Sequence, residues 1–360
     1  MQRRTAVVGV DIGGTKSRAG VVDVQTLDIV ISAAIATPRL PPDLFYDAIA
    51  DLVRQVRAQA ERASHTVLPL VAVAHPGRFL PDGSVARGTT PNLGTAPGQF
   101  DGSRPAQELA RRLSSRVHAE NDAVAQMRFG LDLLLRDPAT RPHLLGETVV
   151  YLGPGTGMGG GVARVSSEGV VTTVTDGHFF DLLIPGNDED PLTAEELFTG
   201  PAIARDIAAR NARLSHPITP ATAEQLDRLL SAVGSPEPPI EAQRIADAFG
   251  EIFARLIATV HAGAIRKVRV DISPAGRMGR YVDEPDRAWS DEDRAAVRGV
   301  RRVLFGGSVG CSAGLGGRIR ERAVAVLRQQ GLGEIMVFPV PAVSADAGLL
   351  GVVLGLPKAD

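Results

Sequence analysis

The chain has 360 residues, a length that predicts two domains. Of these residues 44% are hydrophobic, 22% charged and 4% aromatic, a composition that excludes fibrous and disordered classes. The formal net charge of −2 and the scarcity of aromatic residues argue against a nucleic-acid partner. Cys311 is the single cysteine, which excludes an intramolecular disulfide and a cysteine-based zinc cluster.

No targeting or membrane segment is expected. The apolar stretch after the N-terminal arginines is too short for the core of a signal peptide. The longest late apolar run, residues 347–356, is far below the ~20 residues of a membrane span. We therefore expect a cytoplasmic protein with no membrane partner.

The first half of the chain alternates strand and helix patterns, which predicts an α/β fold with a mixed sheet. Strands are indicated by β-branched runs and helices by apolar residues at helical spacing. In chain order we expect two strands around a glycine turn within 7–24, a third strand before residue 37, a helix over 42–63, a strand over 69–77, a helix over 105–113, a strand from 117 and a helix over 123–135.

A second unit of the same plan begins at Thr148. VVYLGPGTGMGGGVARV and VVGVDIGGTKSRAGVVD both have four apolar residues, a glycine-rich turn and a second strand. The repetition indicates a duplicated architecture, and two unrelated β-hairpins are the alternative. Further along we expect a long helix over 241–267, a surface excursion with a short helix over 271–298, a strand over 303–305, a helix over 318–330, a strand over 335–340 and a helix of small residues over 344–355.

Three glycine-rich turns are candidates for binding phosphate: Gly13-Gly14, Gly153–Gly161 and Gly306-Gly307. The G-x-G-x-x-G from residue 155 leads into a strand, whereas a dinucleotide fingerprint opens a helix. No Gly-Lys pair exists to make a P-loop. The G-x-S-x-G from residue 306 matches a hydrolase nucleophile elbow, but all seven histidines precede it in the chain. A nucleotide site made of hairpin turns remains, with turn geometry alone as its alternative.

Two carboxylates stand beside these turns. Asp11 ends the first strand ahead of Thr15 and Lys16, and a carboxylate there could hold Mg²⁺ through water. Asn121 and Asp122 lie where a strand leads into a helix, and both residue types are favoured N-caps. Phosphoryl transfer to an alcohol also needs a carboxylate that accepts the hydroxyl proton, so Asp122 is a candidate base.

A series of motifs then completes the pattern: DIGGTKSRAGVVD, AHPG, TPNL, ENDA, LGPGTGMGGG, DGH, AEELFTGPA, LFGGSVG and SADAGLLG. Together they resemble the ROK family of bacterial sugar kinases, within the actin, Hsp70 and hexokinase ATPase superfamily. The resemblance covers nearly the whole chain. It implies a two-domain, actin-like (ribonuclease H-like) α/β fold with mixed sheets and a central cleft. The small domain would be 1–120, joined by the C-terminal helix about 345–360, and the large domain 121–344, with an insertion near 271–298.

The resemblance also implies an activity, the ATP-dependent phosphorylation of a hexose at its 6-hydroxyl, with glucose the leading substrate. Asp122 would be the general base, and Asp11 would place Mg²⁺ through water. The sugar hydroxyls would be bound by Asn92, Asn121, Asp122, His178 and Glu195. ATP would be bound by Asp11, Gly13, Gly14, Thr15, Lys16, Gly155, Thr156, Gly157, Gly306 and Gly307.

The chain departs from the family pattern at the sugar side. The stretch after His178 lacks the zinc-binding cysteines of most members, so the resemblance is to the zinc-free glucokinase branch and no zinc is expected. That branch has glutamate three residues before the histidine, where this chain has Thr175. A kinase for fructose, mannose or an N-acetylhexosamine, and a non-catalytic sugar-binding homologue, therefore remain alternatives. A homodimer is expected from the resemblance alone, and His75 and Cys311 are interpreted as structural.

Overall fold

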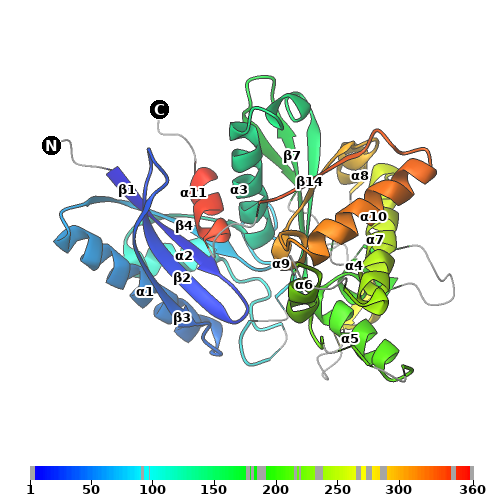
Figure 1. Cartoon of the computed structure of the whole chain (residues 1–360). Helices are drawn as coiled ribbons and strands as arrows, with labels where there is room; N and C mark the ends of the chain where they lie inside the picture. Colours follow the sequence, from blue (N-terminus) through cyan, green and yellow to red (C-terminus); the bar gives the residue numbers. More distant parts are fainter. Residues whose placement is uncertain are drawn as a thin grey trace. The chain divides into compact units, whose positions relative to one another are not determined.

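The computed structural model divides the chain into two compact units (Figure 1). Unit 1 holds Met1–Phe129, Arg269–Arg287 and Ser344–Asp360, and unit 2 holds Gly130–Val268 and Ala288–Val343. Each unit contains one five-stranded sheet. The structure describes residues 5–90, 93–96, 98–175, 179, 182–184, 192–214, 217–218, 220–231, 238–264, 269–272, 278–283, 290–341 and 346–356.

The sheet of unit 1 has the strand order β3-β2-β1-β4-β5. Strands β1, β2 and β3 form an antiparallel meander, and β4 and β5 are added in parallel with β1. Asp11 pairs with Ala74, and His75 pairs with Asn121. The carboxyl ends of three parallel strands therefore meet at one edge, where α/β sheets bind their ligands. The strands are β1 (Thr5–Ile12), β2 (Lys16–Asp23), β3 (Ile29–Ala36), β4 (Thr66–His75) and β5 (Arg116–Asn121).

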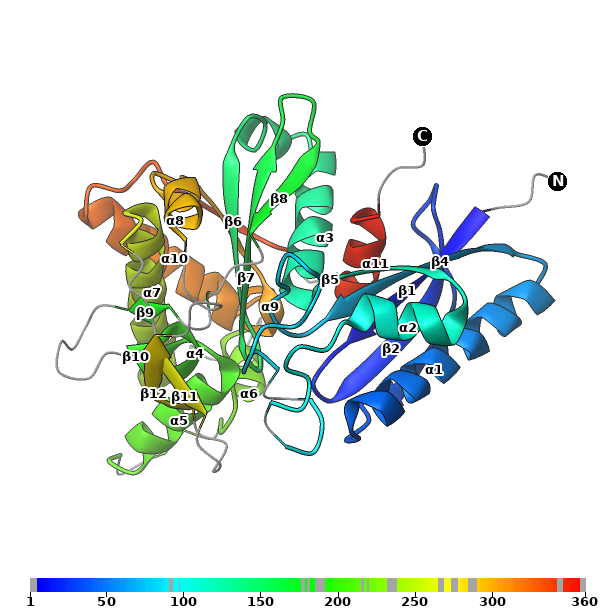
Figure 2. The ribbon, with the colours of Figure 1, turned by 180° about the vertical axis from the view of Figure 1, so that it is seen from behind.

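Helices cover both faces of this sheet. Helices α1 (Pro42–Arg62) and α2 (Pro105–Leu113) lie on one face, and α11 (Ala347–Leu354) lies on the other (Figure 2). Successive residues of a strand point to opposite faces. Val8 accordingly belongs to the apolar cluster of α1, whereas Val7 belongs to that of α11.

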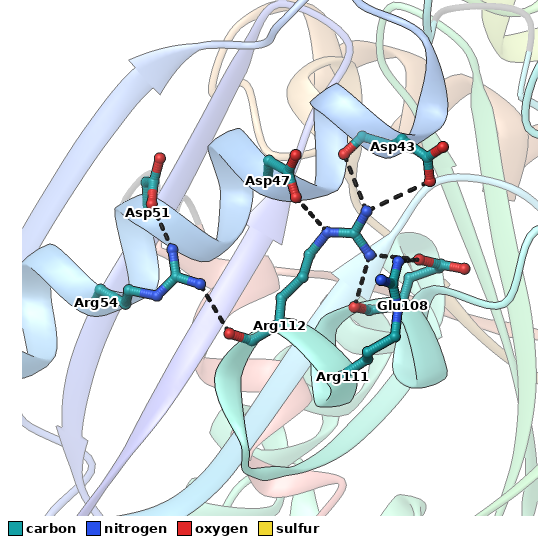
Figure 3. A network of polar contacts seen from close by, with 7 residues as sticks. All are labelled: Asp43, Asp47, Asp51, Arg54, Glu108, Arg111 and Arg112. Carbon is teal, nitrogen blue, oxygen red and sulfur yellow. Dashed lines mark hydrogen bonds and ion pairs between the residues drawn. The ribbon is translucent and has the colours of Figure 1, made fainter.

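An arginine on α2 ties the two helices together (Figure 3). Nε of Arg112 donates to Asp47 Oδ1 at 2.6 Å, and its other nitrogens bond Glu108 and Asp43. Its guanidinium carbon lies 6.0 Å from the centre of the Tyr46 ring, within the range of a cation–π contact. The side chain is 8% exposed, so this clamp fixes the α1–α2 pair and the ring of Tyr46 beneath it.

The sheet of unit 2 repeats the plan of unit 1, with the order β14-β13-β6-β7-β8. Three strands form an antiparallel meander, and two are added in parallel with the first. The expectation of two units of one plan is confirmed. These strands are β6 (Thr148–Pro154), β7 (Met158–Val165), β8 (Val171–Thr175), β13 (Arg302–Phe305) and β14 (Met336–Pro339).

The main apolar core of unit 2 lies between its sheet and two long helices, α7 (Ile240–His261) and α10 (Leu315–Gln329). Two charge-assisted hydrogen bonds of 2.8 Å from Arg318 to Asp247 link these helices. No helix in the described part of the chain is long and apolar enough to cross a bilayer. The other elements are α3 (Asp122–Arg136), η1 (Arg141–His143), β9 (Leu183–Ile184), β10 (Leu192–Thr193), α4 (Ala194–Leu197), α5 (Gly200–Asn211), α6 (Ala223–Ser231), β11 (Arg269–Ile272), β12 (Met278–Asp283), α8 (Asp291–Val297) and α9 (Gly307–Gly310).

Two expectations about the later half need correction. The helix expected over 241–267 ends at His261, because Gly263 turns the chain with a φ of +63°. The excursion expected over 271–298 contains a hairpin, β11–β12, and the short helix α8. It is not wholly a surface segment, because Val297 of α8 is fully buried in the core of unit 2.

Candidate active site

Two carboxylates stand at the carboxyl edge of the unit 1 sheet. Asp11 is the penultimate residue of β1, and Asp122 begins α3 directly after β5. Burial, with the nearby charge of Asp122 next in size, raises the pKa of Asp11 to about 7 against the pull of Arg18. Burial raises the pKa of Asp122 to about 6, opposed by the backbone N–H of Ala123. The structure thus brings the candidate base and the candidate magnesium residue into electrostatic range of each other.

Asp11 is held against the start of α11. A Cβ added to Gly348 would lie 2.6 Å from Cγ and both carboxylate oxygens of Asp11, so only glycine fits there. Arg18 on β2 forms an ion pair with Asp346, which directly precedes α11. Arg18 lies in the motif DIGGTKSRAGVVD, and Asp346 and Gly348 lie in SADAGLLG, but the sequence pattern alone gave no sign of these contacts.

Asn121 caps α3. Its Oδ1 accepts hydrogen bonds from the N–H groups of Ala123 at 2.9 Å and Val124 at 3.2 Å. Its Nδ2 donates to the carbonyl of Gly77 at 2.8 Å. The N-cap interpretation therefore applies to Asn121, while Asp122 is the first residue of the helix. The role of Asn121 in binding sugar stays a prediction.

The first glycine turn is anchored by its own backbone and by the end of β3. Gly13 N–H donates to the carbonyl of Lys16 at 3.0 Å, and Oγ1 of Thr37 donates to the carbonyl of Gly13 at 2.6 Å. Among the described residues, the N–H groups of Gly14 and Thr15 have no hydrogen-bond acceptor. Adjacent free N–H groups beside a lysine are suited to an anion such as phosphate.

The second glycine turn, between β6 and β7, is anchored to α4 and to the first residue of α5. Gly155 N–H donates to the carbonyl of Gly157 at 2.8 Å, and Gly200 N–H donates to the carbonyl of Gly155 at 2.8 Å. Oε2 of Glu195 accepts the N–H of Met158 at 3.0 Å and lies 3.1 Å from where a Cβ of Gly157 would be. The predicted sugar ligand Glu195 therefore packs directly against the predicted phosphate turn; Thr156 lies exposed between its two glycines.

The third glycine turn packs around one ring. A Cβ on Gly306 would lie 2.4 Å from the ring of Tyr151, and one on Gly153 would lie 2.5 Å from its hydroxyl oxygen. Gly307, with a φ of +65°, donates its N–H to that hydroxyl at 3.0 Å. Packing on Tyr151 thus explains Gly153 and Gly306, whereas Gly307 has a positive φ and a Cβ there would lie 2.4 Å from the carbonyl oxygen of Pro154. The N–H group of Gly307 is already used inside the protein. The roles of Gly306 and Gly307 beside adenosine stay predictions.

Two predicted sugar ligands, Asn92 and His178, lie outside the described residues. Part of the stretch to which the zinc prediction refers, residues 180–181 and 185–191, lies outside them too. Within the described ranges, no group of three or more His, Cys, Asp or Glu side chains could hold a metal ion. Asp11 suits Mg²⁺ by its donor chemistry, because Mg²⁺ takes one or two carboxylates and keeps several waters. Burial and, after it, the nearby charge of Asp122 raise the pKa of Asp11, and a bound cation would stabilise the ionised form of that carboxylate.

No protein-family model matches the chain, and no curated protein matches it. Solved structures do match. A ROK hexokinase from Thermus thermophilus is 21% identical over 97% of each chain, with a TM-score of 0.57. A ROK family glucokinase from Streptomyces griseus, solved with glucose and AMPPNP, is 19% identical over 97% of this chain and 98% of that one, with a TM-score of 0.55. The chain has the fold of the ROK sugar kinases.

The expected actin-like α/β fold with two mixed sheets is therefore confirmed. The ROK fold is not confined to kinases. A ROK family transcriptional regulator, a homologue of the E. coli MLC protein, is 12% identical over 97% of this chain and 77% of that one, with a TM-score of 0.64. Function must therefore be argued from the residues of the site rather than from the ROK fold.

Proposed function

We propose that the chain is a ROK family kinase that transfers the γ-phosphoryl group of ATP to the 6-hydroxyl of a hexose, with glucose the leading substrate. The observation that carries the proposal is Asp122, whose carboxylate begins α3 at the carboxyl edge of the unit 1 sheet with a pKa of about 6. A general base works best when its pKa lies near the operating pH. An unperturbed aspartate would be a weaker base.

Asp122 accepts the proton of the 6-hydroxyl as that oxygen bonds to the γ-phosphorus. The bond from the γ-phosphorus to the bridging oxygen breaks, and ADP leaves with that electron pair. Little covalent chemistry is asked of the protein, so positioning and charge carry most of the catalysis. The chain supplies these through Asp122 and the donors of the first two glycine turns.

The phosphate side uses backbone donors and positive charge. The N–H groups of Gly14 and Thr15, which have no acceptor among the described residues, support binding of phosphate oxygens. Lys16 is an exposed positive charge beside them, and the exposed Arg39 donates to the carbonyl of Gly14 at 3.0 Å. Asp11 would hold Mg²⁺ through water, and bound Mg²⁺ would neutralise charge that develops on the phosphoryl group. The turn at Gly155–Gly157 would bind phosphate from unit 2.

The sugar side relies on Asn92, Asn121, His178 and Glu195. Within unit 2, Glu195 would connect the sugar site with the phosphate turn. The carboxylate that would bind sugar accepts the N–H of Met158, the residue that follows the turn at Gly155–Gly157. Thr175, at the end of β8, supplies no carboxylate where the glucokinase branch has one. Substrate choice is therefore the part of the proposal that most needs a panel of sugars.

A coupled assay of ADP release tests the proposal. Wild type and Asp122→Asn are compared on glucose, fructose, mannose, N-acetylglucosamine and N-acetylmannosamine. Removal of a general base lowers kcat by about 10²–10⁴-fold. Asp132→Asn is the matched control, because it makes the same change on the same helix in a residue paired with Arg136 at 2.8 Å. The proposal fails if no sugar stimulates turnover above the level of Asp122→Asn.

A second candidate is a non-catalytic sugar-binding protein, which Thr175 and the likeness to a ROK regulator favour. Calorimetry that finds micromolar sugar binding by a protein without phosphoryl transfer would support it. We also propose a homodimer in the cytoplasm. Sedimentation equilibrium tests the dimer, and fractionation of the producing cells tests the location.

A further inference from the structure

His75 is a buried titratable residue that the proposed mechanism does not use. It is the last residue of β4 and its side chain is 0% exposed, as is that of Tyr46 on α1. Nδ1 lies 2.6 Å from the carbonyl oxygen of Pro76, and Nε2 lies 3.2 Å from the hydroxyl oxygen of Tyr46. Both ring nitrogens therefore have hydrogen-bond partners, and the partner of Nδ1, Pro76, belongs to the turn that follows β4.

The direction of each hydrogen bond can be assigned. A carbonyl only accepts, so Nδ1 carries the proton and donates to Pro76. Burial lowers the pKa of His75 to about 4, so the ring is neutral near pH 7 and Nε2 accepts from Tyr46. Burial also raises the pKa of Tyr46, which keeps its proton, and Ser103 then donates to the phenol oxygen across 3.3 Å. This forms one directed chain from Ser103 to Pro76.

The hydrogen-bond chain that ends at Pro76 is connected through the next residue to the candidate base. Gly77 follows Pro76 with a φ of +97°, and its carbonyl accepts the hydrogen bond from Nδ2 of Asn121. Asn121 in turn caps the helix that begins with Asp122. His75 therefore holds the carbonyl of Pro76. The carbonyl of the next residue, Gly77, holds the side chain of Asn121, which caps α3.

The ring that donates to His75 is itself fixed. Tyr46 packs edge to face against Phe45 and Phe100, with ring centres 5.4 Å and 5.9 Å apart. The guanidinium of Arg112, drawn in Figure 3, lies over its face. An apolar side chain at position 75 would fill the same core without the cost of burying an imidazole. Only a side chain with a hydrogen-bond donor can hold the Pro76 carbonyl from that position.

We propose that His75 is a positioning residue for Asp122, acting through the Pro76 carbonyl, the Gly77 carbonyl and the cap made by Asn121. The inference rests on the proposed kinase function for its catalytic readout. It also has a readout that needs no activity, the amide hydrogen exchange of Ala123 and Val124, whose N–H groups the cap holds.

Two variants separate positioning from packing. The side-chain amide of His75→Asn has an atom at the position of Nδ1 and can still donate to Pro76, although it leaves a larger cavity. The amide of His75→Gln reaches the position of Nε2, fills the core better and cannot reproduce the bond to Pro76. The proposal expects His75→Asn to keep kcat within about threefold of wild type and His75→Gln to lose about 10-fold to 100-fold, with KM for ATP unchanged in both.

Hydrogen exchange follows the same order. Ala123 and Val124 should exchange faster in His75→Gln and at the wild-type rate in His75→Asn. Val56→Ala, a core truncation in α1 within the same apolar cluster, controls for lost stability and should change neither kcat nor this exchange. If the two His75 variants are equal in both measurements, or if activity follows melting temperature across all three variants, the proposal is overturned.

Two further results keep the outcomes distinct. A wild type with no activity on any sugar, but with the expected exchange pattern, overturns the kinase function and supports the positioning. If both His75 variants fail to fold, Tyr46→Phe removes the donor to Nε2, together with the acceptor of Ser103, and leaves the His75 side chain intact. It should raise the exchange of Ala123 and Val124, and wild-type exchange would overturn the proposal.

Discussion

Replacing Gly348 by alanine tests how Asp11 is held. The new Cβ would lie 2.6 Å from the carboxylate of Asp11, whereas ordinary contact begins at 3.4 Å. Either the carboxylate or the first turn of α11 must move by about 0.8 Å, the difference between those distances. The ion pair between Arg18 and Asp346 restrains the segment that leads into α11, so we expect the carboxylate to move.

The expected loss follows from that displacement. A misplacement of ~1 Å at a reacting centre can cost ~10²-fold in rate. We therefore expect kcat to fall about 30-fold to 100-fold in Gly348→Ala, which is roughly 2–3 kcal/mol of activation free energy. Alanine is about 1 kcal/mol better than glycine inside a helix. The unfolding free energy should therefore change less than the activation free energy.

The assay is coupled ADP release at saturating ATP, with the Mg²⁺ concentration varied and the best hexose of the panel. Gly317→Ala is the control, because it lies in α10 and a Cβ there would meet nothing within 4 Å. That variant should gain stability and keep its kcat. A kcat for Gly348→Ala within twofold of wild type would refute the reasoning.

Three further predictions concern stability. Because the pKa of Asp11 is raised from 3.8 to about 7, the folded state keeps a proton that the unfolded state has released between those values, and stability falls as pH rises through that window. In urea titrations with EDTA, the unfolding free energy of Asp11→Asn relative to wild type should therefore increase from pH 4 to pH 8, and a constant difference would contradict this. A Cβ on Gly351 would lie 1.8 Å from the carbonyl oxygen of Ala125, so Gly351→Ala should lose about 1–3 kcal/mol, and an unchanged melting temperature would count against it. Tyr151→Phe removes the acceptor of the Gly307 N–H and should lose about 1 kcal/mol in the same titration, whereas a variant as stable as wild type would show that this bond contributes nothing.

Local patterns predicted the helices and strands well. Phe45, Ile49 and Val53 recur at helical spacing after Pro42, and all three are buried in α1. The predicted end of α7 was wrong, because the apolar pattern continues past Gly263, whose positive φ ends the helix. Strand order could not be predicted from local pattern, since β4 pairs with β1 across a connection that contains all of α1.

The part of the site that could be predicted consists of residues whose chemical type and place at a strand end both indicate a role. Asp11 and Asp122 stand at strand ends, and the structure brings their charges into range. Tyr151 was missed because a tyrosine in a buried strand has no local sign of what surrounds it. Gly348 was missed for a similar reason, because the carboxylate that excludes a side chain there comes from the other end of the chain.

The cover that α11 gives to one face of the unit 1 sheet has a consequence for biosynthesis. Val7 and Ala72 on that face pack against Leu349 and Val352, which leave the ribosome after all of unit 2 has been made. The first strands synthesised must therefore wait for one of the last helices, with an apolar face uncovered in the nascent chain. In unit 2, β6 likewise waits for its parallel partner β13, which is made much later in the chain.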